Sequence, residues 1–188
     1  MPRSFFILCA LALLAGCETV EKEFIDPFRD AIVWGLPKLV SPLPDGASIY
    51  IERPIGAASQ GVYARNGMTL VRAFEQEFRR RGAKPVVGEK AIADIKETFA
   101  RATAASCRYA LVLDIRSWAY GEAGWSGLGG RDEVVFDAML LDAERERVLS
   151  RAQIEVTNSI INNAPGGGDA DSSVAPVIRR YVGKLYSP

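Results

Sequence analysis

The residue with the clearest potential for chemistry is Cys17, whose thiol ends the segment Leu14-Ala15-Gly16-Cys17. Arg3 and an apolar run from Phe5 to Leu14 precede it, in the order and length of an export signal. Two small residues before a cysteine are the cleavage pattern of bacterial lipoprotein precursors. We therefore expect cleavage between Gly16 and Cys17, and fatty acylation of Cys17, with palmitate as one chain, that holds the protein on a membrane. The alternatives are a secreted protein cut elsewhere and a short transmembrane anchor, although the run is shorter than the roughly 20 residues that span a bilayer.

Catalytic residue types are scarce in the rest of the chain. Histidine is absent, which excludes Ser-His-Asp and Cys-His nucleophilic sites and every zinc site that needs histidine. Asp114 and Asp137 fall on presumed neighbouring strands and could form a carboxylate pair for acid–base work, although solvent-facing positions would also explain them. Asp169 and Asp171, in a glycine-rich loop, are too few for a calcium site. We therefore predict no metal, no cofactor and no enzymatic activity.

An aromatic, glycine-rich stretch at 118–132 is the best candidate for a contact surface. Trp118, Tyr120 and Trp125 stand among several glycines, and Arg131 and Asp132 follow them. Large aromatic side chains on such a loop either fold back onto the core as a lid or contact a partner or ligand. Arg131 and Asp132 either close the loop through an ion pair or bind a polar ligand. The sequence leaves both alternatives open.

Composition limits the class of protein. The 188 residues, less the signal, suffice for one domain with a hydrophobic core but not for two comfortable ones. Basic and acidic side chains balance at 23 each, which argues against nucleic acid or an anionic lipid surface as the main partner. With Cys9 lost in the signal and Cys17 acylated, Cys107 has no disulfide partner. Because Cys107 stands just before an apolar run, we expect its thiol to be buried.

Hydrophobic periodicity divides the rest of the chain into strands and helices. We predict strands at 47–51, 84–87, 109–118, 132–142 and 148–159, and helices at 68–81, 90–106 and 173–186. The order β-α-β-α-β-β-β-α predicts a single α/β (α+β) domain, with a mixed sheet of about five strands and helices packed on it. The expected organisation is a signal peptide at 1–16, an acylated N-terminus and tether at 17–46, and the globular domain at 47–188. Within the tether, Asp26 could cap a short helix that ends at Gly35.

With these segments placed, the chain resembles an uncharacterised family of Gram-negative lipoproteins, catalogued as domain of unknown function 4823. The resemblance covers nearly the whole mature domain and rests on the order of short motifs: Ser48-Ile-Tyr-Ile51, Gly61-Val-Tyr63 to Phe74, Leu113-Asp-Ile-Arg-Ser-Trp118, Trp125-Ser-Gly127, Arg131-Asp132, Leu141-Asp-Ala143, Gly167-Gly-Asp169, Pro176 and Tyr181-Val182. The family usually has a glycine in the turn after Ala143, where this chain has Glu146. The plan is also similar to the N-terminal domain of TolB and to the curli secretion lipoprotein, which implies an envelope docking or assembly module.

The sequence therefore predicts a non-enzymatic lipoprotein on the periplasmic side of the outer membrane that docks an envelope protein or a second copy of itself. Glu18 favours the outer membrane, since aspartate at that place is the usual inner-membrane retention signal in enteric bacteria. The alternative is a glycan or peptidoglycan binder in which Trp118, Tyr120 and Trp125 stack on sugars. A carboxylate-based hydrolase comes third, and it would need two inward-pointing acids in one cleft.

Overall fold

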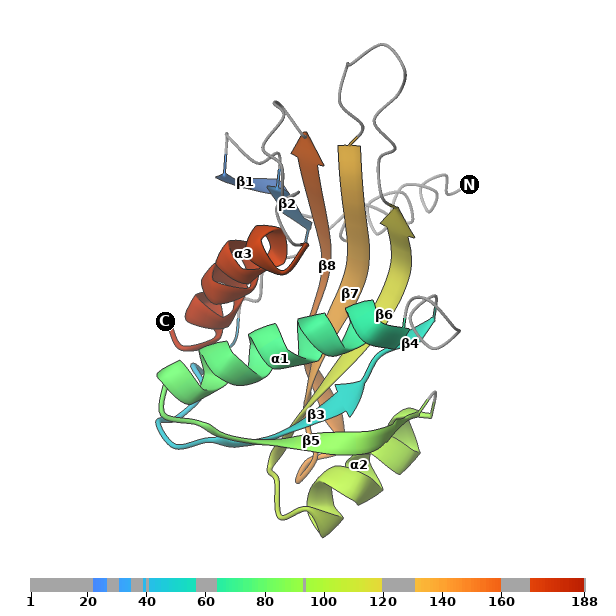
Figure 1. Cartoon of the computed structure of the whole chain (residues 1–188). Coiled ribbons are helices and arrows are strands. Elements are labelled where there is room, and N and C mark those ends of the chain that lie inside the picture. Colours follow the sequence, from blue (N-terminus) through green and yellow to red (C-terminus); the bar gives the residue numbers. More distant parts are fainter. Residues whose placement is uncertain are drawn as a thin grey trace, which may run out of the picture.

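A mixed β-sheet organises the computed structural model, which describes residues 22–26, 31–34, 39, 41–56, 64–92, 94–119, 131–159 and 170–187 (Figure 1). The strands are β1 (Lys22–Asp26), β2 (Ala31–Trp34), β3 (Ser48–Arg53), β4 (Ile55–Gly56), β5 (Lys84–Ala91), β6 (Tyr109–Ala119), β7 (Arg131–Asp142) and β8 (Arg147–Ser159). The helices are α1 (Ala64–Arg80), α2 (Ile95–Ala104) and α3 (Ala170–Leu185). None of these helices is long and apolar enough to cross a membrane.

The strands follow one another across the sheet in the order β1-β2-β8-β7-β6-β3-β5, and β4 pairs with β6. β3 lies parallel to both β5 and β6, whereas β6, β7 and β8 form an antiparallel meander. The predicted single α/β (α+β) domain and its order β-α-β-α-β-β-β-α are therefore confirmed. β1, β2 and β4 are additions to the five predicted strands.

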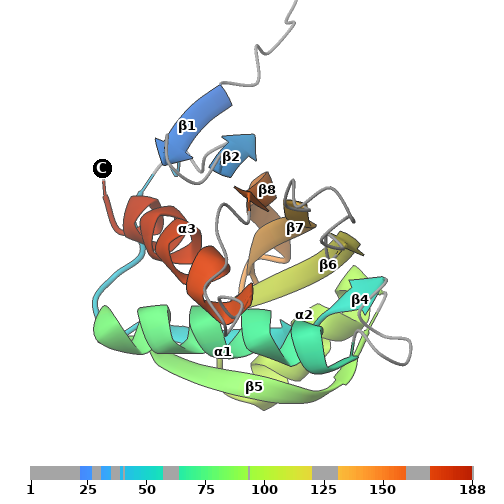
Figure 2. The same cartoon turned by 45° about the horizontal axis from the view of Figure 1, so that its top comes forward.

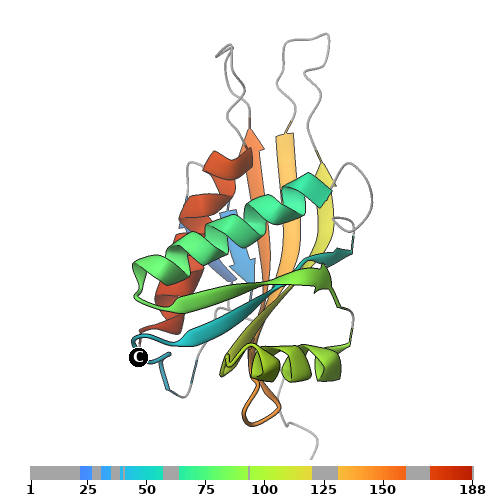
Figure 3. The ribbon, with the colours of Figure 1, turned by 60° about the horizontal axis from the view of Figure 1, so that its bottom comes forward.

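Helices lie on both faces of the sheet. α1 and α3 pack on each other and on one face, where they bury the larger apolar core with β3, β6, β7 and β8 (Figure 2). α2 packs on the opposite face over β3 and β6 and buries a second, smaller core. Figure 3 shows α2 near the end of the sheet at which β7 and β8 are joined. Beside α2 on this face, charged side chains of β6, β7 and β8 line a groove.

Local sequence patterns account for helices α1 and α2. In α1, the predicted stripe of Leu70, Val71, Phe74 and Phe78 is buried, as expected of an amphipathic helix on a core. α2 begins after Asp94, whose Oδ1 accepts a hydrogen bond from the Lys96 backbone N–H at 3.0 Å. α2 starts at Ile95 instead of the predicted residue 90 because β5 continues to Ala91.

The predicted helix between Asp26 and Gly35 is wrong. Ala31–Trp34 forms β2, which pairs antiparallel with β8, with Ala31 opposite Val156. A helix this short is marginal by itself, because its first turn fixes several residues for one hydrogen bond. Isoleucine, valine and tryptophan favour strands instead, and the edge of β8 offers hydrogen-bond partners along the whole segment.

A β-bulge in β6 decides the position of Trp118. Up to Ile115 the odd-numbered residues of β6 face the larger core, but the register with β7 shifts between Ile115 and Ser117. The extra residue reverses the alternation, so Trp118 points into the same core and is only 5% exposed. Of the two alternatives that the sequence left open for Trp118, packing on the core and contact with a partner, the structure shows the first.

The turn between β7 and β8 contains a residue in a glycine-like conformation. Glu146 has φ +49°, in the left-handed region that glycine adopts without a steric penalty. Glu146, where the resembled family usually has glycine, therefore has a backbone conformation that favours glycine. The Asp142 carboxylate, which is almost fully buried, supports the turn by accepting a hydrogen bond from the Arg145 backbone N–H at 3.2 Å.

The thiol of Cys107 is buried, as predicted, at the start of the smaller core. It has no disulfide partner among the described residues. Burial raises the pKa of this thiol, which makes it a poor nucleophile near neutral pH. The Cys107 side chain therefore has a packing role in the smaller core.

Candidate functional site

The structure describes only some of the residues that the sequence singled out. Gly16, Cys17, Tyr120 and Trp125 lie outside the described residues. Arg131 and Asp132 begin β7, where their backbones pair with Ser159 and Asn158, but their side chains also lie outside the described part. Trp118 belongs to the core, as shown above. Asp114 and Asp137, in contrast, are brought together.

Asp114 on β6 and Asp137 on β7 are direct cross-strand partners on the face that carries α2. The Arg116 guanidinium binds both carboxylates, at 3.2 Å from Asp114 Oδ2 and 2.6 Å from Asp137 Oδ2. The hydrogen bond to Asp137 raises the pKa of Arg116. The predicted carboxylate pair exists, and Arg116 bridges its two members, so one cation offsets half of their negative charge.

Arg116→Ala should expose the repulsion between these two carboxylates. We expect the free energy of unfolding to fall by up to about 1 kcal/mol at low ionic strength, since the pair is half-exposed and partly screened. Adding Asp137→Asn to this variant should restore most of the loss, because only one charge remains. Urea unfolding of the parent, the single variant and the double variant measures both effects. A loss that Asp137→Asn leaves unchanged would show that packing of the Arg116 stem, not charge, is responsible.

A groove of about 170 Å³ lies beside this charged trio, between α2 and the sheet. Its lining combines apolar side chains of α2, β6 and β7 with the charged groups above, and includes Ile95, Thr98, Val112, Met139 and Arg151. Thr98, at the inner side of the groove, contacts through its hydroxyl a glutamate side chain that is not exposed to solvent. That glutamate is Glu52.

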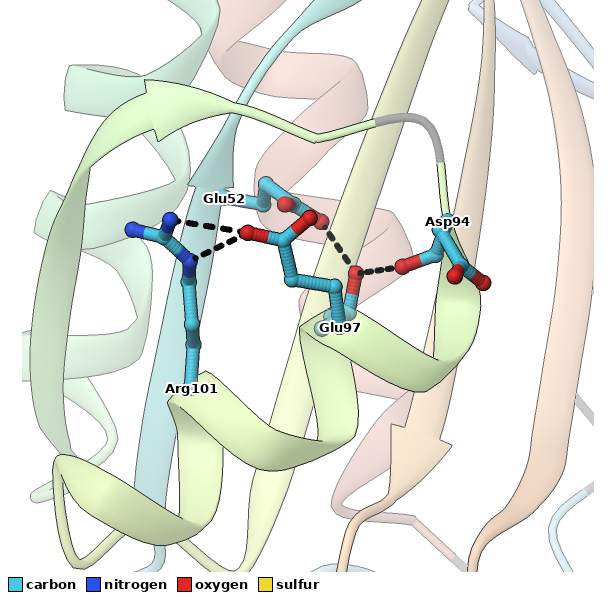
Figure 4. Close-up of polar contacts among 5 residues, drawn as sticks. Glu52, Asp94, Glu97 and Arg101 are labelled. Carbon is cyan, nitrogen blue, oxygen red and sulfur yellow. Dashed lines mark hydrogen bonds and ion pairs between the residues drawn. The ribbon is translucent and has the colours of Figure 1, made fainter.

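Glu52, on β3, is a fully buried carboxyl group (Figure 4). Thr98 Oγ1 lies 2.7 Å from Glu52 Oε2 and 3.2 Å from the Asp94 carbonyl oxygen, one turn earlier in α2. Glu52 Oε1 makes no hydrogen bond with any described residue. Nearby Arg101 binds Glu97 instead, through its Nε at 3.1 Å and Nη2 at 2.8 Å, so it does not form an ion pair with Glu52.

These contacts favour a protonated Glu52. The Thr98 hydroxyl has one hydrogen and can donate it to Glu52 or to the Asp94 carbonyl, but not to both. If Glu52 carries a proton, its Oε2–H donates to Thr98 Oγ1 and Thr98 donates to Asp94, so both contacts become proper hydrogen bonds. The remaining oxygen is then a neutral carbonyl, which costs less to bury than a carboxylate. In agreement, burial raises the pKa of Glu52 to about 7.

Sequence reasoning missed Glu52 and Thr98, although one signal was available. Strand β3 alternates between the two cores, with Ile49 and Ile51 on one side and Tyr50 on the other. Glu52 lies on the same face of the sheet as Tyr50, because residues two apart in a strand point to the same side. Its carboxyl group therefore faces whichever element covers that side of the sheet. That this element is α2 cannot be read from β3 alone, since Glu52 and Thr98 are 46 residues apart.

The acidic side chains at and behind the groove are buried or ion-paired. Glu52 has no exposed surface, and Arg116 contacts both Asp114 and Asp137. Within the described ranges, no group of three or more histidine, cysteine, aspartate or glutamate side chains could hold a metal ion.

Comparison with known proteins identifies the fold. The chain matches a PelC dodecamer from Paraburkholderia phytofirmans with a TM-score of 0.60 and 18% identity, over 84% of this chain and 99% of that one. The chain is similar in fold to PelC. It also matches lipoprotein GNA1162 from Neisseria meningitidis with a TM-score of 0.50 and 12% identity, over 73% of this chain and 98% of that one. The sequence thus adopts a lipoprotein-like fold.

Sequence comparisons are negative. No protein-family model matches the chain, and no curated protein matches it. The resemblance to domain of unknown function 4823 and the likeness to TolB and the curli secretion lipoprotein therefore stay predictions.

Proposed function

We propose that the chain is a lipoprotein of the bacterial cell envelope, cleaved before Cys17 and anchored by fatty chains on that residue, that serves as a non-enzymatic docking or assembly module. The fold shared with PelC and with lipoprotein GNA1162 carries the proposal. The Leu14–Cys17 pattern supports the anchor independently of the fold. We place the protein on the periplasmic side of the outer membrane, on the evidence of Glu18.

Self-association is the form of assembly that we favour. The similar PelC chain is a dodecamer, and nearly its whole length aligns with this chain. The candidate contact residues are those of the predicted loop, Tyr120, Trp125, Arg131 and Asp132. Glycan binding, the alternative, keeps only Tyr120 and Trp125 as stacking residues because Trp118 is buried. We therefore favour a protein partner, with a second copy of this chain as the first to test.

The anchor is tested with Cys17→Ser. The parent chain should take up labelled palmitate and remain in the membrane fraction, because several acyl chains give nearly irreversible attachment. The variant should lose the label and appear in the soluble periplasmic fraction, with its fold unchanged by circular dichroism. A Cys17→Ser protein that stays in the membrane, with its leader removed as usual, would overturn the proposed anchor. Cys107→Ser is the matched control and should keep the label.

The soluble Cys17→Ser protein also tests assembly. Light scattering should give a mass that is a multiple of the mass of one mature chain, which is 20.5 kDa less the mass of the signal peptide. We expect Tyr120→Ala with Trp125→Ala to lower this mass while leaving the far-ultraviolet spectrum unchanged. The control is Val86→Ala, which truncates an exposed apolar side chain on the edge strand β5. A monomer at every concentration would exclude self-association and leave a different envelope protein as the partner.

A further inference from the structure

A second hollow, of about 330 Å³, lies at the end of the sheet where β6 begins and β7 turns into β8. Three arginines line it, Arg108, Arg145 and Arg147, together with apolar side chains such as Leu43 and Val148. Its volume falls at the lower end of the range typical of small-ligand sites, roughly 300–1,000 Å³. No part of this pocket belongs to the groove beside α2.

The arginines come from two segments that meet at this end of the sheet. The Arg108 backbone N–H donates to Ser48 Oγ at 3.1 Å, and its carbonyl accepts from the Ala143 N–H at 2.8 Å. Arg145 and Arg147 flank Glu146, the residue with the glycine-like φ of +49°. A residue with a Cβ adopts that region at a steric cost, so the backbone at Glu146 is strained. The turn therefore maintains a strained conformation while it carries two arginines to the rim of the pocket.

The positive charge of the pocket is only partly neutralised. Arg108 contacts Glu144 at 3.3 Å, and Arg145 lies 4.0 Å from Asp142, whose carboxylate also supports the turn. The Arg147 side chain is exposed and makes no ion pair within the described part of the chain. The pocket lining includes one carboxylate, that of Asp142. Glu144, which contacts Arg108, and the exposed Glu146 lie in the same turn, so Arg147 is the arginine of the three that is left for a ligand without breaking an ion pair.

We propose that this pocket binds an amphiphilic anion, with a phosphate or carboxylate group held by Arg108, Arg145 and Arg147. Planar guanidinium groups bind both kinds of oxyanion through paired hydrogen bonds. The apolar wall takes a hydrocarbon part of the ligand, and Val148, 47% exposed in the structure, would be covered by it. Such a ligand comes either from a phospholipid or from a soluble acid.

The test uses the soluble Cys17→Ser protein and three probes: dihexanoyl phosphatidic acid, inorganic phosphate and, as a zwitterionic control, dihexanoyl phosphatidylcholine. Calorimetric titration should show phosphatidic acid binding at least about tenfold more tightly than phosphatidylcholine. Arg145→Gln with Arg147→Gln should weaken that binding by about tenfold or more, since each lost charged contact is worth at least a factor of several. Raising sodium chloride should weaken it as well, as expected for a charged contact near the surface.

Arg72→Gln is the matched control, because Arg72 is an exposed arginine on α1, outside the pocket. Its binding should equal that of the parent. Phosphatidic acid binding more tightly than inorganic phosphate supports an amphiphile as the ligand, whereas equal binding of the two would contradict it, because the apolar wall would then contribute nothing. Urea unfolding verifies that the double variant folds. Unchanged affinity in a folded double variant, or equal binding of phosphatidylcholine, would overturn the site.

Discussion

Glu52→Gln should stabilise the protein at pH 8 by about 3 kcal/mol and leave it almost unchanged at pH 4. The reason is the burial of Glu52, which raises its pKa from 4.5 to about 7 in the folded protein. Glutamine is neutral at both pH values and can donate a hydrogen bond from its amide to Thr98 Oγ1, as the protonated acid does. The variant therefore keeps the contact with α2 and removes the cost of burying a negative charge.

The direction of the pH effect follows from proton binding. Between pH 4.5 and about 7 the unfolded chain has lost the Glu52 proton while the folded protein keeps it. The free energy of unfolding consequently falls as pH rises through this window and levels off above it, by about 1.4 kcal/mol for each unit of pKa difference. The stabilising effect of neutral Glu52 is complete below pH 4.5 and lost above pH 7.

The groups that face Glu52 do not obscure this effect. Tyr50, on the same strand, has a pKa raised further above 10 by burial, and Arg101 stays charged with Glu97 as its partner. Urea unfolding at pH 4, 5.5, 7 and 8 measures the difference between parent and Glu52→Gln. The control is Glu89→Gln, which removes an exposed carboxylate from β5 that is not among the groups acting on the pKa of Glu52, and it should keep the pH profile of the parent. Parallel profiles for parent and Glu52→Gln would contradict a protonated Glu52, as would a carboxyl chemical shift of Glu52 that titrates near pH 4.

Phe74→Ala should lower the free energy of unfolding by about 3–5 kcal/mol. Phe74 is fully buried where α1 meets both α3 and the sheet. Its ring lies edge-on to Phe136 of β7 at 6.2 Å and to Tyr181 of α3 at 5.9 Å, measured between centroids. Removal of the ring leaves a cavity between three elements that cannot all move together to fill it.

Urea unfolding at pH 6 tests this prediction. Phe74→Leu should cost clearly less than Phe74→Ala, because most of the volume is kept. Val86→Ala, at an exposed position on β5, should change stability by less than about 0.5 kcal/mol. A loss below about 2 kcal/mol for Phe74→Ala would mean that α1 and α3 close over the gap, and that the larger core is less rigidly packed than its aromatic contacts indicate.

Features that depend on neighbouring residues were predictable from the sequence. The stripe from Leu70 to Phe78 specifies α1 because a helix brings residues three and four apart onto one face. The order of elements and the antiparallel meander follow from similar local patterns and from short connections. The Leu14–Cys17 pattern likewise needs no tertiary information, since it is a linear signal, and its acylation stays a prediction.

Features that depend on distant residues required the tertiary structure. The sequence left open whether Trp118 packs on the core, because the bulge after Ile115, which turns its side chain inward, exists only in the pairing with β7. β2 reads as a helix because the strand that holds it, β8, comes more than a hundred residues later. Glu52 became a candidate site only through α2, which buries it and gives it one partner. Sequence periodicity reports which face of a segment is apolar, whereas strand register and helix docking decide what that face meets.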